Sequence, residues 1–507
     1  MAIFLWTLVQ FSVNTILIMV VNLYTISYLT LFLFIDYLSW QAALTRVIQA
    51  QFSLMVEQLA RLTSESAPDQ PLYRVELPLP AIALKGFLAS QSIKEKAYWS
   101  DRDGDYSVAT LGYSWSETLS SRKDISVAFA NARTLLGSLP ELSGARCLCY
   151  LSFSDNIECI WPSFGYGRII LPLVEVVESR KGHVLGVNLR SGNDIEWQSS
   201  LRKAVEVIQS LTWQQQLPVI NVQTTLNGYM PSYNDWKEMI ANAKNAFATA
   251  YLKKVVFSRE TRLDINGQLS SWSLLHAWKQ ANPQSYQFWF QGDNEVFLGC
   301  SPERLVKRLE NVISTEALAG TIVRGFDSTE DDQYAQALMN DRKNLHENRL
   351  VLDDICTQLA SLCQTLEADR SHSIVKLRHI QHLRYQIRGV LNESVHDEHL
   401  LQALHPTPAV GGTPRHEAMS FIAKHEPYAR GLYAGVCGTL SVQKSDFSVA
   451  IRSARLTEQS LRLYSGAGIV EASVAEDEWL ELDNKIATVV DILSCQRDQK
   501  YNVQVWS

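Results

Sequence analysis

The sequence predicts a mixed α/β protein. In the first part of the chain, from about residue 41 to residue 216, short strand-like runs such as Ile169 to Val177 alternate with polar turns such as Asp101 to Asp105. Further along, strand-like runs alternate with long helical patterns. The chain has 507 residues, of which 46% are hydrophobic, so it can fill one large two-lobed domain or two to three ordinary ones.

A second lobe begins after a turn-rich passage near residues 227–233, and a helix is expected over 236–250. Three runs rich in β-branched and aromatic residues follow, and they predict strands over 255–259, 286–291 and 296–300. The predicted divisions are a hydrophobic segment (1–40), an N-terminal lobe (41–226), a second lobe (227–495) and a C-terminal tail (496–507).

A long helix is the next expected element. Ser328 or Thr329 would cap its N-terminus ahead of the acids at 330–332, and the helix would end near Gln364. Its apolar face would comprise Leu338, Leu345, Leu352, Ile355, Leu359 and Leu362. The remaining expected elements are a loop (405–414), two strands (447–456 and 461–465) and a closing helix (476–493).

Charge and cysteine content exclude two classes of protein. The formal net charge is -7 and there is no basic run, which argues against a nucleic-acid surface, because phosphate binding needs clustered Lys and Arg. The eight cysteines form no CxxC pair and have no His at zinc-ligand spacing, so no zinc site is predicted. Scattered cysteines fit a reducing, cytoplasmic compartment.

The N-terminal segment, residues 1–40, is unusually apolar. Its only charged side chain is Asp36, and residues 16–35 are long enough to span a bilayer. Without the basic leading residues of a secretory signal, a retained anchor is favoured over a cleaved peptide. The alternative is a true start further downstream, such as Met55, because residues 52–62 already have the pattern of an amphipathic helix. We therefore expect a cytoplasmic monomer that contacts a membrane only through residues 1–40, if at all.

The closing helix carries Glu478, Glu481 and Lys485 three and four residues apart, so all three project from one face. That face could hold a cation, although an exposed Glu-Lys pair is the commoner meaning of such spacing. Before this helix, Gly466-Ala467-Gly468 would let backbone N–H groups approach an anion closely. The alternative there is a simple turn at the end of a strand.

Three other residues are candidates on chemical grounds. Glu347 lies in mid-helix and, together with a glutamate from another helix, would suit Mg²⁺; taken alone it is more often a solvated residue. Lys254 or its neighbour Lys253 begins a strand, and the one that points inward could act as a general base. Glu303 could be a general acid if an apolar pocket keeps it protonated; otherwise it is a turn residue.

These segments, taken in order, resemble the chorismate-utilising family, which includes isochorismate synthases, salicylate synthases and the large subunits of anthranilate and aminodeoxychorismate synthases. The resemblance covers about half the chain strongly. The region before Asn227 fits the variable N-terminal lobe of that family, and residues 1–40 lie outside it. The matching motifs are Lys254 to Arg259, Ser301 to Leu305, Thr315 to Thr321, His346 to Asn348, Ile380 to Leu383, His405 to Pro414, Ile451-Arg452, and Gly466 to Val470 with Glu478 to Glu481.

The resemblance implies a fold of two large antiparallel sheets packed as a sandwich with helices outside. It also implies roles for two of the candidates. Lys254 would activate water for attack at ring carbon 2 of chorismate, and Glu303 would protonate the hydroxyl that departs from carbon 4. The double bond shifts between the two events, so the reaction is an isomerisation of chorismate.

Ligands for the metal and the substrate are implied in the same way. Glu347 and Glu481 correspond to direct Mg²⁺ ligands, with Glu478 as an outer partner, and the metal would neutralise the ring carboxylate. The remaining matches are positions that hold or contact the substrate: His382, Arg452, Gly466, Gly468 and Lys485.

Ala409 decides the expected reaction within the family. Aminating and salicylate-forming relatives resemble one another in carrying Thr at this position, whereas Ala leaves room for water and offers no hydroxyl to orient ammonia. The helix from Glu347 to Cys356 looks most like the menaquinone or phylloquinone branch. An isochorismate synthase is therefore expected. The alternatives are a salicylate synthase, an aminating enzyme and, more remotely, a membrane-anchored scaffold without catalysis.

Overall fold

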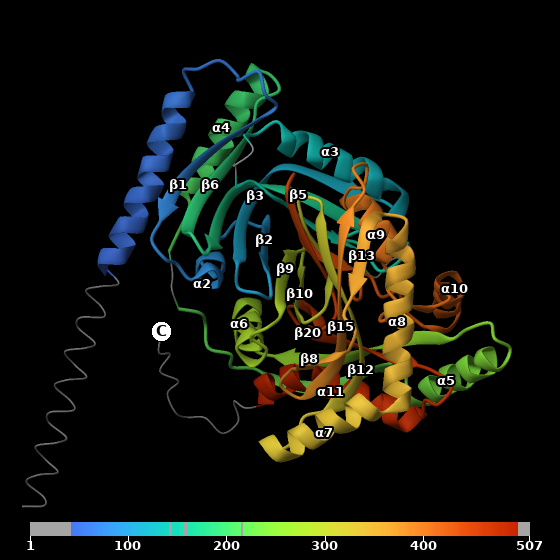
Figure 1. Ribbon diagram of the computed structural model, residues 1–507. Coiled ribbons are helices and arrows are strands. Elements are labelled where there is room, and N and C mark those ends of the chain that lie inside the picture. Colours follow the sequence, from blue (N-terminus) through green and yellow to red (C-terminus); the bar gives the residue numbers. More distant parts are fainter. Residues whose placement is uncertain (1–41, 141–143, 156–160, 214–215, 495–507) are drawn as a thin grey trace, which may run out of the picture.

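The strands of the protein form one antiparallel network that bends into two facing runs (Figure 1). The computed structural model describes residues 42–140, 144–155, 161–213 and 216–494. The hydrophobic segment 1–40, for which an anchor is predicted, and the predicted tail 496–507 lie outside the described residues. Within the described ranges, no helix combines the length and the apolar character needed to cross a bilayer.

Strands and helices alternate along the chain, as the sequence predicts. The strands are β1 (Leu72–Leu79), β2 (Lys96–Ser100), β3 (Tyr106–Leu119), β4 (Cys147–Leu151), β5 (Gly167–Ser179), β6 (Gly182–Arg190), β7 (Gln223–Met230), β8 (Lys254–Asn266), β9 (Tyr286–Gln291), β10 (Glu295–Ser301), β11 (Arg304–Leu309), β12 (Val312–Val323), β13 (Cys363–Ala368), β14 (Ser373–Lys376), β15 (Ile380–Leu391), β16 (Gly412–Thr413), β17 (Val436–Leu440), β18 (Lys444–Val449), β19 (Ser453–Thr457) and β20 (Ser460–Ile469). The helices are residues 42–62, α2 (Leu84–Ala89), η1 (Arg122–Asp124), α3 (Ile125–Gly137), α4 (Asp194–Gln209), α5 (Tyr233–Ala248), α6 (Ser271–Ala281), α7 (Ser328–Asn340), α8 (Arg342–Ala360), α9 (Asp397–Leu404), α10 (Arg415–His425) and α11 (Ala475–Ser494).

The predicted fold class is confirmed, and the two expected sheets are two runs of one branched sheet. The first run pairs β1, β6, β5, β3, β2, β9, β10, β19, β20, β8 and β7 in that order. The second leaves β5 through β4 and continues through β17, β18, β11, β12 and β15. The branch exists because β5, with 13 residues, is long enough to pair with β4 and β6 in succession along one edge.

The runs interleave the two predicted lobes. β2 pairs with β9, and β4 pairs with β17, so strands from the first 190 residues continue directly into strands of the second lobe. The boundary expected near residue 227 therefore does not mark a break in the sheet.

The chain crosses between the runs at two neighbouring points. β10 of the first run leads to β11 of the second through Pro302 and Glu303, and β18 leads back to β19 through residues 450–452. The single strand predicted over 447–456 is wrong for this reason, because the chain leaves one run and enters the other there. Backbone bonds join the crossings, from Val449 N–H to the Glu303 carbonyl (3.2 Å) and from Cys300 N–H to the Arg452 carbonyl (2.9 Å).

Alternating side chains of the first run fill two hydrophobic cores, as expected for strands buried on both faces. Trp99 and Phe297 belong to the inner core, which also contains residues of the second run such as Phe447. Their neighbours Tyr98 and Leu298 belong to an outer core under the helices 42–62, α2, α4, α6 and α11.

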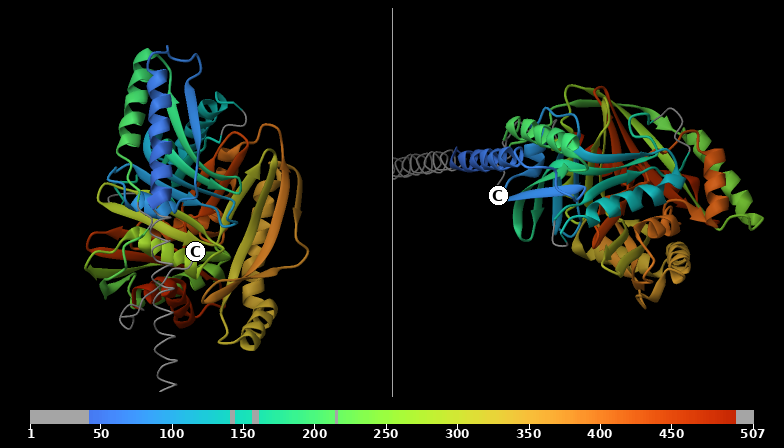
Figure 2. Two further views of the ribbon diagram at one scale, coloured as in Figure 1. Left: turned by 90° about the vertical axis from the view of Figure 1, so that its left-hand side faces the viewer. Right: turned by 90° about the horizontal axis from the view of Figure 1, so that it is seen from above.

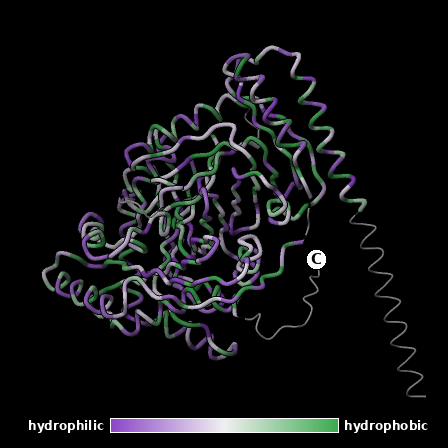
Figure 3. Tube along the Cα trace, turned by 180° about the vertical axis from the view of Figure 1, so that it is seen from behind, coloured by the Kyte–Doolittle hydropathy of each residue, from purple (hydrophilic) through white to green (hydrophobic). Residues whose placement is uncertain are grey.

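The helix 42–62 lies beside α4 on the outer face of β1 and β6 (Figure 2). Hydrophobic and hydrophilic residues alternate along both helices, as in amphipathic helices (Figure 3). Ile48, Phe52, Met55 and Leu59 of this helix are buried in the outer core. Met55, the alternative start, is therefore an internal residue of a helix whose upstream residues also pack on the fold.

The long helix predicted from residue 328 to residue 364 is two helices. Asp341 separates α7 from α8: its backbone is extended (ψ 116°) and its carboxylate accepts from the Asn344 N–H at 2.8 Å, which caps α8. The predicted cap at Ser328 or Thr329 is also wrong by one residue, because Asp327 accepts the N–H bonds of Thr329 and Glu330. The predicted core residues Leu338, Leu352, Ile355 and Leu359 are buried, whereas Leu345 and Leu362 are half-buried.

Candidate active site

A pocket of about 670 Å³, including its open mouth, lies where the two runs and the helices α8 and α11 meet. Most of the residues selected from the sequence line it, although they come from seven separate parts of the chain. The candidates that line it are Glu303, Glu347, His382, Ala409, Arg452, Gly466, Gly468, Glu481 and Lys485. Lys254 and Glu478 lie beside this set rather than on the pocket wall.

Glu303 is the buried acid of the pocket. It occupies the turn between β10 and β11 and is 5% exposed. Burial and, to a smaller extent, the Glu316 carboxylate raise the pKa of Glu303 to about 8, against the opposing effect of Lys254, Lys485 and Arg452. A carboxyl group with this pKa is largely protonated at neutral pH and can therefore donate a proton.

Lys254 is the inward-pointing member of the lysine pair. It begins β8 and is fully buried, whereas Lys253 is exposed, which is the alternation expected of a strand. The Lys254 Nζ lies 2.8 Å from Glu347 Oε1, but the angle is too poor for a hydrogen bond. The amine is thus an ion-pair partner that retains hydrogen-bonding capacity at the edge of the pocket.

Two carboxylates face the pocket from different helices, Glu347 from α8 and Glu481 from α11, and each is paired with a lysine. Glu481 Oε1 lies 2.5 Å from Lys485 Nζ. Glu478, one turn before, is buried and pairs with Lys343 at 2.6 Å; burial raises the pKa of Glu478, and Glu481 adds to the rise.

The carboxylate pair fits a hard cation only if other oxygens complete its shell. In the described part of the chain, no group of three or more His, Cys, Asp or Glu side chains is placed to hold a metal. Mg²⁺ is commonly held by one or two carboxylates together with water and substrate oxygens, which is the donor set that Glu347 and Glu481 would leave open.

A cationic part of the pocket wall, beside these carboxylates, suits an anion. Arg452 stands at the second crossing with a positive φ of 47°, and burial lowers the pKa of its guanidinium to about 10, so it remains charged at neutral pH. Among the described residues its guanidinium has no ion-pair partner. Lys485 Nζ donates to the Gly466 carbonyl at 2.7 Å.

Backbone amides add to this wall. The Gly466 carbonyl faces Lys485 rather than β8, and N–H and C=O of one residue point to the same edge of a strand. The N–H groups of Gly466 and, two residues on, Gly468 therefore point to the same open edge. This register is consistent with the prediction that the two amides can face an anion.

Both positions require glycine, because neighbouring side chains approach the backbone too closely to leave room for a Cβ atom. A Cβ on Gly468 would collide with Glu347 Oε1 and lie 2.9 Å from Lys254 Cε. A Cβ on Gly466 would lie 2.8 Å from the Tyr433 hydroxyl. Side chains at these positions would displace the acid, the amine and the tyrosine that surround the pocket.

His382 is a neutral histidine of the pocket wall. Its Nδ1 lies 3.0 Å from Thr321 Oγ1 and 3.3 Å from the Gly320 carbonyl. Burial lowers the pKa of His382 well below its usual value, and the charges of Arg452 and Lys485 lower it further. Because a carbonyl can only accept, the bond to Gly320 places the proton on Nδ1 and leaves Nε2 as an acceptor.

Ala409 lies in the predicted loop and is half-buried on the pocket wall. Arg430 fixes this loop against the strand that carries Lys254, because its guanidinium donates to the carbonyls of Val410 (2.8 Å) and Val256 (2.7 Å). Glu426 in turn pairs with Arg430 at 2.6 Å.

Two further residues of the site were not among the predicted site residues, although Asn348 belongs to the matching motif His346 to Asn348. Tyr433 lines the pocket and stacks on Tyr464, with ring centroids 5.3 Å apart. Asn348 donates to the carbonyls of Ala319 (2.9 Å) and Leu383 (3.1 Å), and so holds the turn of α8 that carries Glu347. A single tyrosine or asparagine has no characteristic spacing, so only the fold identifies them.

Comparisons with known proteins agree with this geometry. The family model described as "Chorismate binding enzyme" matches residues 57–494. The chain is 35% identical over 447 residues to isochorismate synthase MenF of Escherichia coli, covering 87% of this chain and 98% of the relative. It is 32% identical to the enzyme of the same name in Bacillus subtilis, covering 66% of this chain and 72% of that one.

Solved structures give the same result. The structure of MenF, the menaquinone-specific isochorismate synthase of Escherichia coli, is similar with a TM-score of 0.77 and 34% identity, covering 87% of this chain and 99% of that chain. Anthranilate synthase component I of Streptococcus pneumoniae is similar in fold alone, with a TM-score of 0.62, 18% identity, and coverage of 76% of this chain and 92% of that chain.

Proposed function

The chain belongs to the family of chorismate-binding enzymes, and from that premise we propose that it is an isochorismate synthase that converts chorismate to isochorismate. The observation that carries the proposal is the placement of a buried lysine and a buried, protonated glutamic acid at one pocket with a cationic wall. General acid–base chemistry needs both groups within reach of one substrate.

In this proposal Lys254 accepts a proton from the water whose oxygen forms the new bond to ring carbon 2. The ring double bond shifts, the bond between carbon 4 and its hydroxyl oxygen breaks, and Glu303 donates its proton so that the hydroxyl leaves as water. One water is consumed and one is released, so the reaction is an isomerisation.

The cationic wall binds and orients the substrate. Arg452 and Lys485, with the N–H groups of Gly466 and Gly468, hold its carboxylates, and Arg suits a bidentate grip on a carboxylate. The Nε2 of His382 accepts a hydrogen bond from the substrate. Glu347 and Glu481, with Glu478 beside them, would hold Mg²⁺, and the bound ion would supply charge to neutralise the ring carboxylate.

Ala409 supports release of isochorismate rather than further reaction. A methyl side chain leaves space for water and has no hydroxyl to orient ammonia. Relatives named for menaquinone synthesis lead us to place the product in menaquinone or phylloquinone biosynthesis.

A further part of the proposal concerns the setting of the enzyme. We infer a monomer in a reducing, cytoplasmic compartment, with any membrane contact confined to residues 1–40. The free thiols of Cys149 and Cys437, buried on the paired strands β4 and β17, support the compartment. Light scattering during size-exclusion chromatography that gave the mass of a dimer would refute the monomer.

Product analysis tests the proposed function. Purified protein with chorismate and Mg²⁺ should yield isochorismate, separated and quantified by chromatography. Salicylate or anthranilate accompanied by pyruvate as the main products would contradict the proposal. The Lys254→Ala variant should make no product while remaining folded, and Lys253→Ala, which alters the exposed neighbour, is its matched control and should keep full activity.

A further inference from the structure

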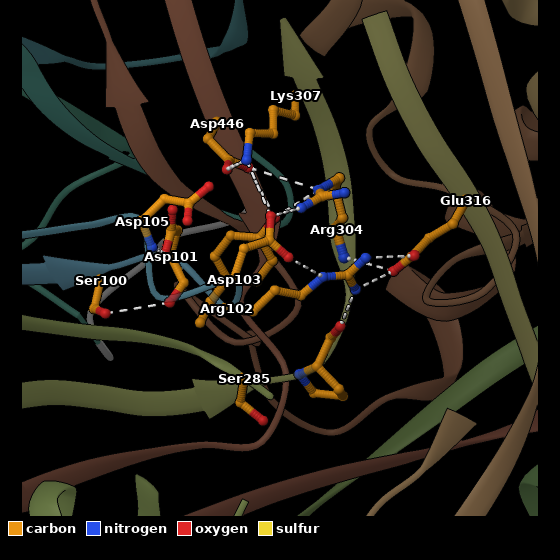
Figure 4. A network of polar contacts seen from close by, with 12 residues as sticks. Ser100, Asp101, Arg102, Asp103, Asp105, Ser285, Arg304, Lys307, Glu316 and Asp446 are labelled. Atoms are coloured by element: carbon orange, nitrogen blue, oxygen red, sulfur yellow. Dashed lines mark hydrogen bonds and ion pairs between the residues drawn. The ribbon is translucent and has the colours of Figure 1, made fainter. Parts of the chain in front are cut away.

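Arg102 reaches the acid of the site from the N-terminal half of the chain. It lies in the turn between β2 and β3, about 200 residues before Glu303, and its side chain points from that turn toward the first crossing (Figure 4). The sequence gives this turn no chemical role, because its acids and arginine have the composition of an ordinary polar turn.

The guanidinium of Arg102 bonds to two groups close to Glu303, one in the backbone and one in a side chain. Its Nη1 donates to the Pro302 carbonyl at 2.7 Å. Nη1 and Nη2 also donate to the two carboxylate oxygens of Glu316, at 2.6 and 2.7 Å. Glu316 Oε1 accepts from the Arg304 N–H at 3.1 Å. The residues immediately before and after Glu303 are therefore both tied to one ion pair.

This ion pair is shielded from water. The side chain of Arg102 is 12% exposed and that of Glu316 is 2% exposed. The Tyr286 ring, with its centroid 5.7 Å from the guanidinium carbon, covers one side of Arg102. A bidentate pair in this setting is geometrically exacting, and removal of one partner leaves a buried charge without compensation.

We propose that Arg102 and Glu316 are positioning residues for Glu303. Their ion pair fixes the backbone on both sides of this acid, at Pro302 and Arg304, and so orients its carboxyl group toward the departing hydroxyl. Neither residue lines the pocket. The inference rests on the proposed function, because it assigns Glu303 the role of acid. It makes the N-terminal half of the chain part of the catalytic apparatus.

Steady-state kinetics of the Arg102→Met variant tests the proposal. Misplacement of the acid should lower kcat by roughly 10- to 100-fold. KM should change by less than about threefold, because Arg452, Lys485 and the glycine amides keep their places. The double variant Arg102→Met/Glu316→Gln should recover part of kcat, since it no longer contains an unpaired buried carboxylate beside Glu303.

Lys307→Met is the matched control. Lys307 belongs to the same polar network and pairs with Asp103 (3.0 Å) and Asp446 (3.6 Å), but it forms no hydrogen bond or ion pair with Glu316 or Pro302. Its loss removes the same charge and should leave kcat unchanged. Arg102→Lys, which keeps the charge but not the bidentate grip, should give an intermediate kcat and serves if Arg102→Met does not fold.

The proposal is overturned if Arg102→Met and Arg102→Lys retain wild-type kcat, if KM rises while kcat is kept, or if the losses in the double variant simply add. Failure of the proposed function would look different, since the wild-type protein would then make no isochorismate in the same assay.

Discussion

Glu303 determines the pH dependence that we expect of the enzyme. The residue acts as an acid only when protonated, and its pKa is about 8, so kcat/KM should fall as the pH rises through that value. Four charged groups face it: Glu316 raises its pKa, whereas Lys254, Lys485 and Arg452 lower it. The Tyr433 hydroxyl also lies nearby, and burial raises the pKa of that hydroxyl, so it is neutral.

The Glu316→Gln variant tests this assignment, because it removes the carboxylate that helps to raise the pKa. The alkaline limb of the kcat/KM profile should therefore move to lower pH, whatever happens to the maximal rate. A limb that stays in place or moves to higher pH would show that Glu303 is not the titrating acid.

Gly468 is a second residue whose identity the site dictates. In the Gly468→Ala variant the new methyl group collides with Glu347 Oε1 and approaches Lys254 Cε, so kcat/KM should fall by at least about tenfold. Gly137→Ala is a suitable control, because a Cβ at the end of α3 meets no atom within 4 Å and should change stability by less than about 0.5 kcal/mol. Wild-type kinetics in Gly468→Ala would refute the close approach.

At the scale of elements, Arg259 holds α11 to β8. Its guanidinium carbon lies 4.6 Å from the Tyr229 ring centroid and 4.4 Å from that of Trp479, and Nη2 bonds Asp483 at 2.5 Å. Trp479 and Asp483 lie on the same helix as Glu481 and Lys485. The contact therefore sets how α11 presents its charged face to the pocket.

The Arg259→Met variant should lower the free energy of unfolding by roughly 1 to 3 kcal/mol, because cation–π contacts and a charged hydrogen bond are lost. It should also raise KM, since Lys485 moves with the helix. Chemical denaturation and steady-state kinetics measure the two effects. Arg349→Met, which breaks only an exposed pair with Asp353, is the control; equal effects from both variants would refute a specific role for Arg259.

Individual elements show what local sequence can and cannot predict. Strand alternation correctly predicted that only one of Lys253 and Lys254 points inward, but it left open which one, and the structure shows that Lys254 is the buried residue. The same pattern failed at Arg452, where one strand was predicted over residues 447–456. The composition typical of strands continues through these residues, although β18 ends and β19 begins there in the other run of the sheet. The break between α7 and α8 was missed for a similar reason: Asp341 is one acid among several, and only its extended backbone shows that it is a cap.

At the scale of the whole molecule, the two predicted lobes share one sheet. The β2–β9 and β4–β17 pairings carry main-chain hydrogen bonds across the predicted boundary, so neither lobe keeps a complete sheet without the other. We expect a single cooperative transition in scanning calorimetry. Two separable transitions would contradict the continuity of the sheet.

The same continuity explains which parts of the site were predictable. The fold class and the eleven candidate site residues followed from the sequence and its family resemblance, and nine of those residues line one pocket. Arg102 could not be found, because its importance depends on a contact with Pro302 and Glu316 across some 200 residues. Tertiary contacts of this kind have no local pattern.

In the proposed reaction, water adds at ring carbon 2 while the hydroxyl at carbon 4 leaves, with Lys254 as the base and Glu303 as the acid. The most direct test is turnover of chorismate with Mg²⁺ in ¹⁸O-labelled water, followed by mass spectrometry of the isochorismate formed at low conversion. We expect one ¹⁸O atom in the product, at carbon 2. Isochorismate that contains no label would mean that the original hydroxyl migrates within the substrate, and would contradict the proposed reaction.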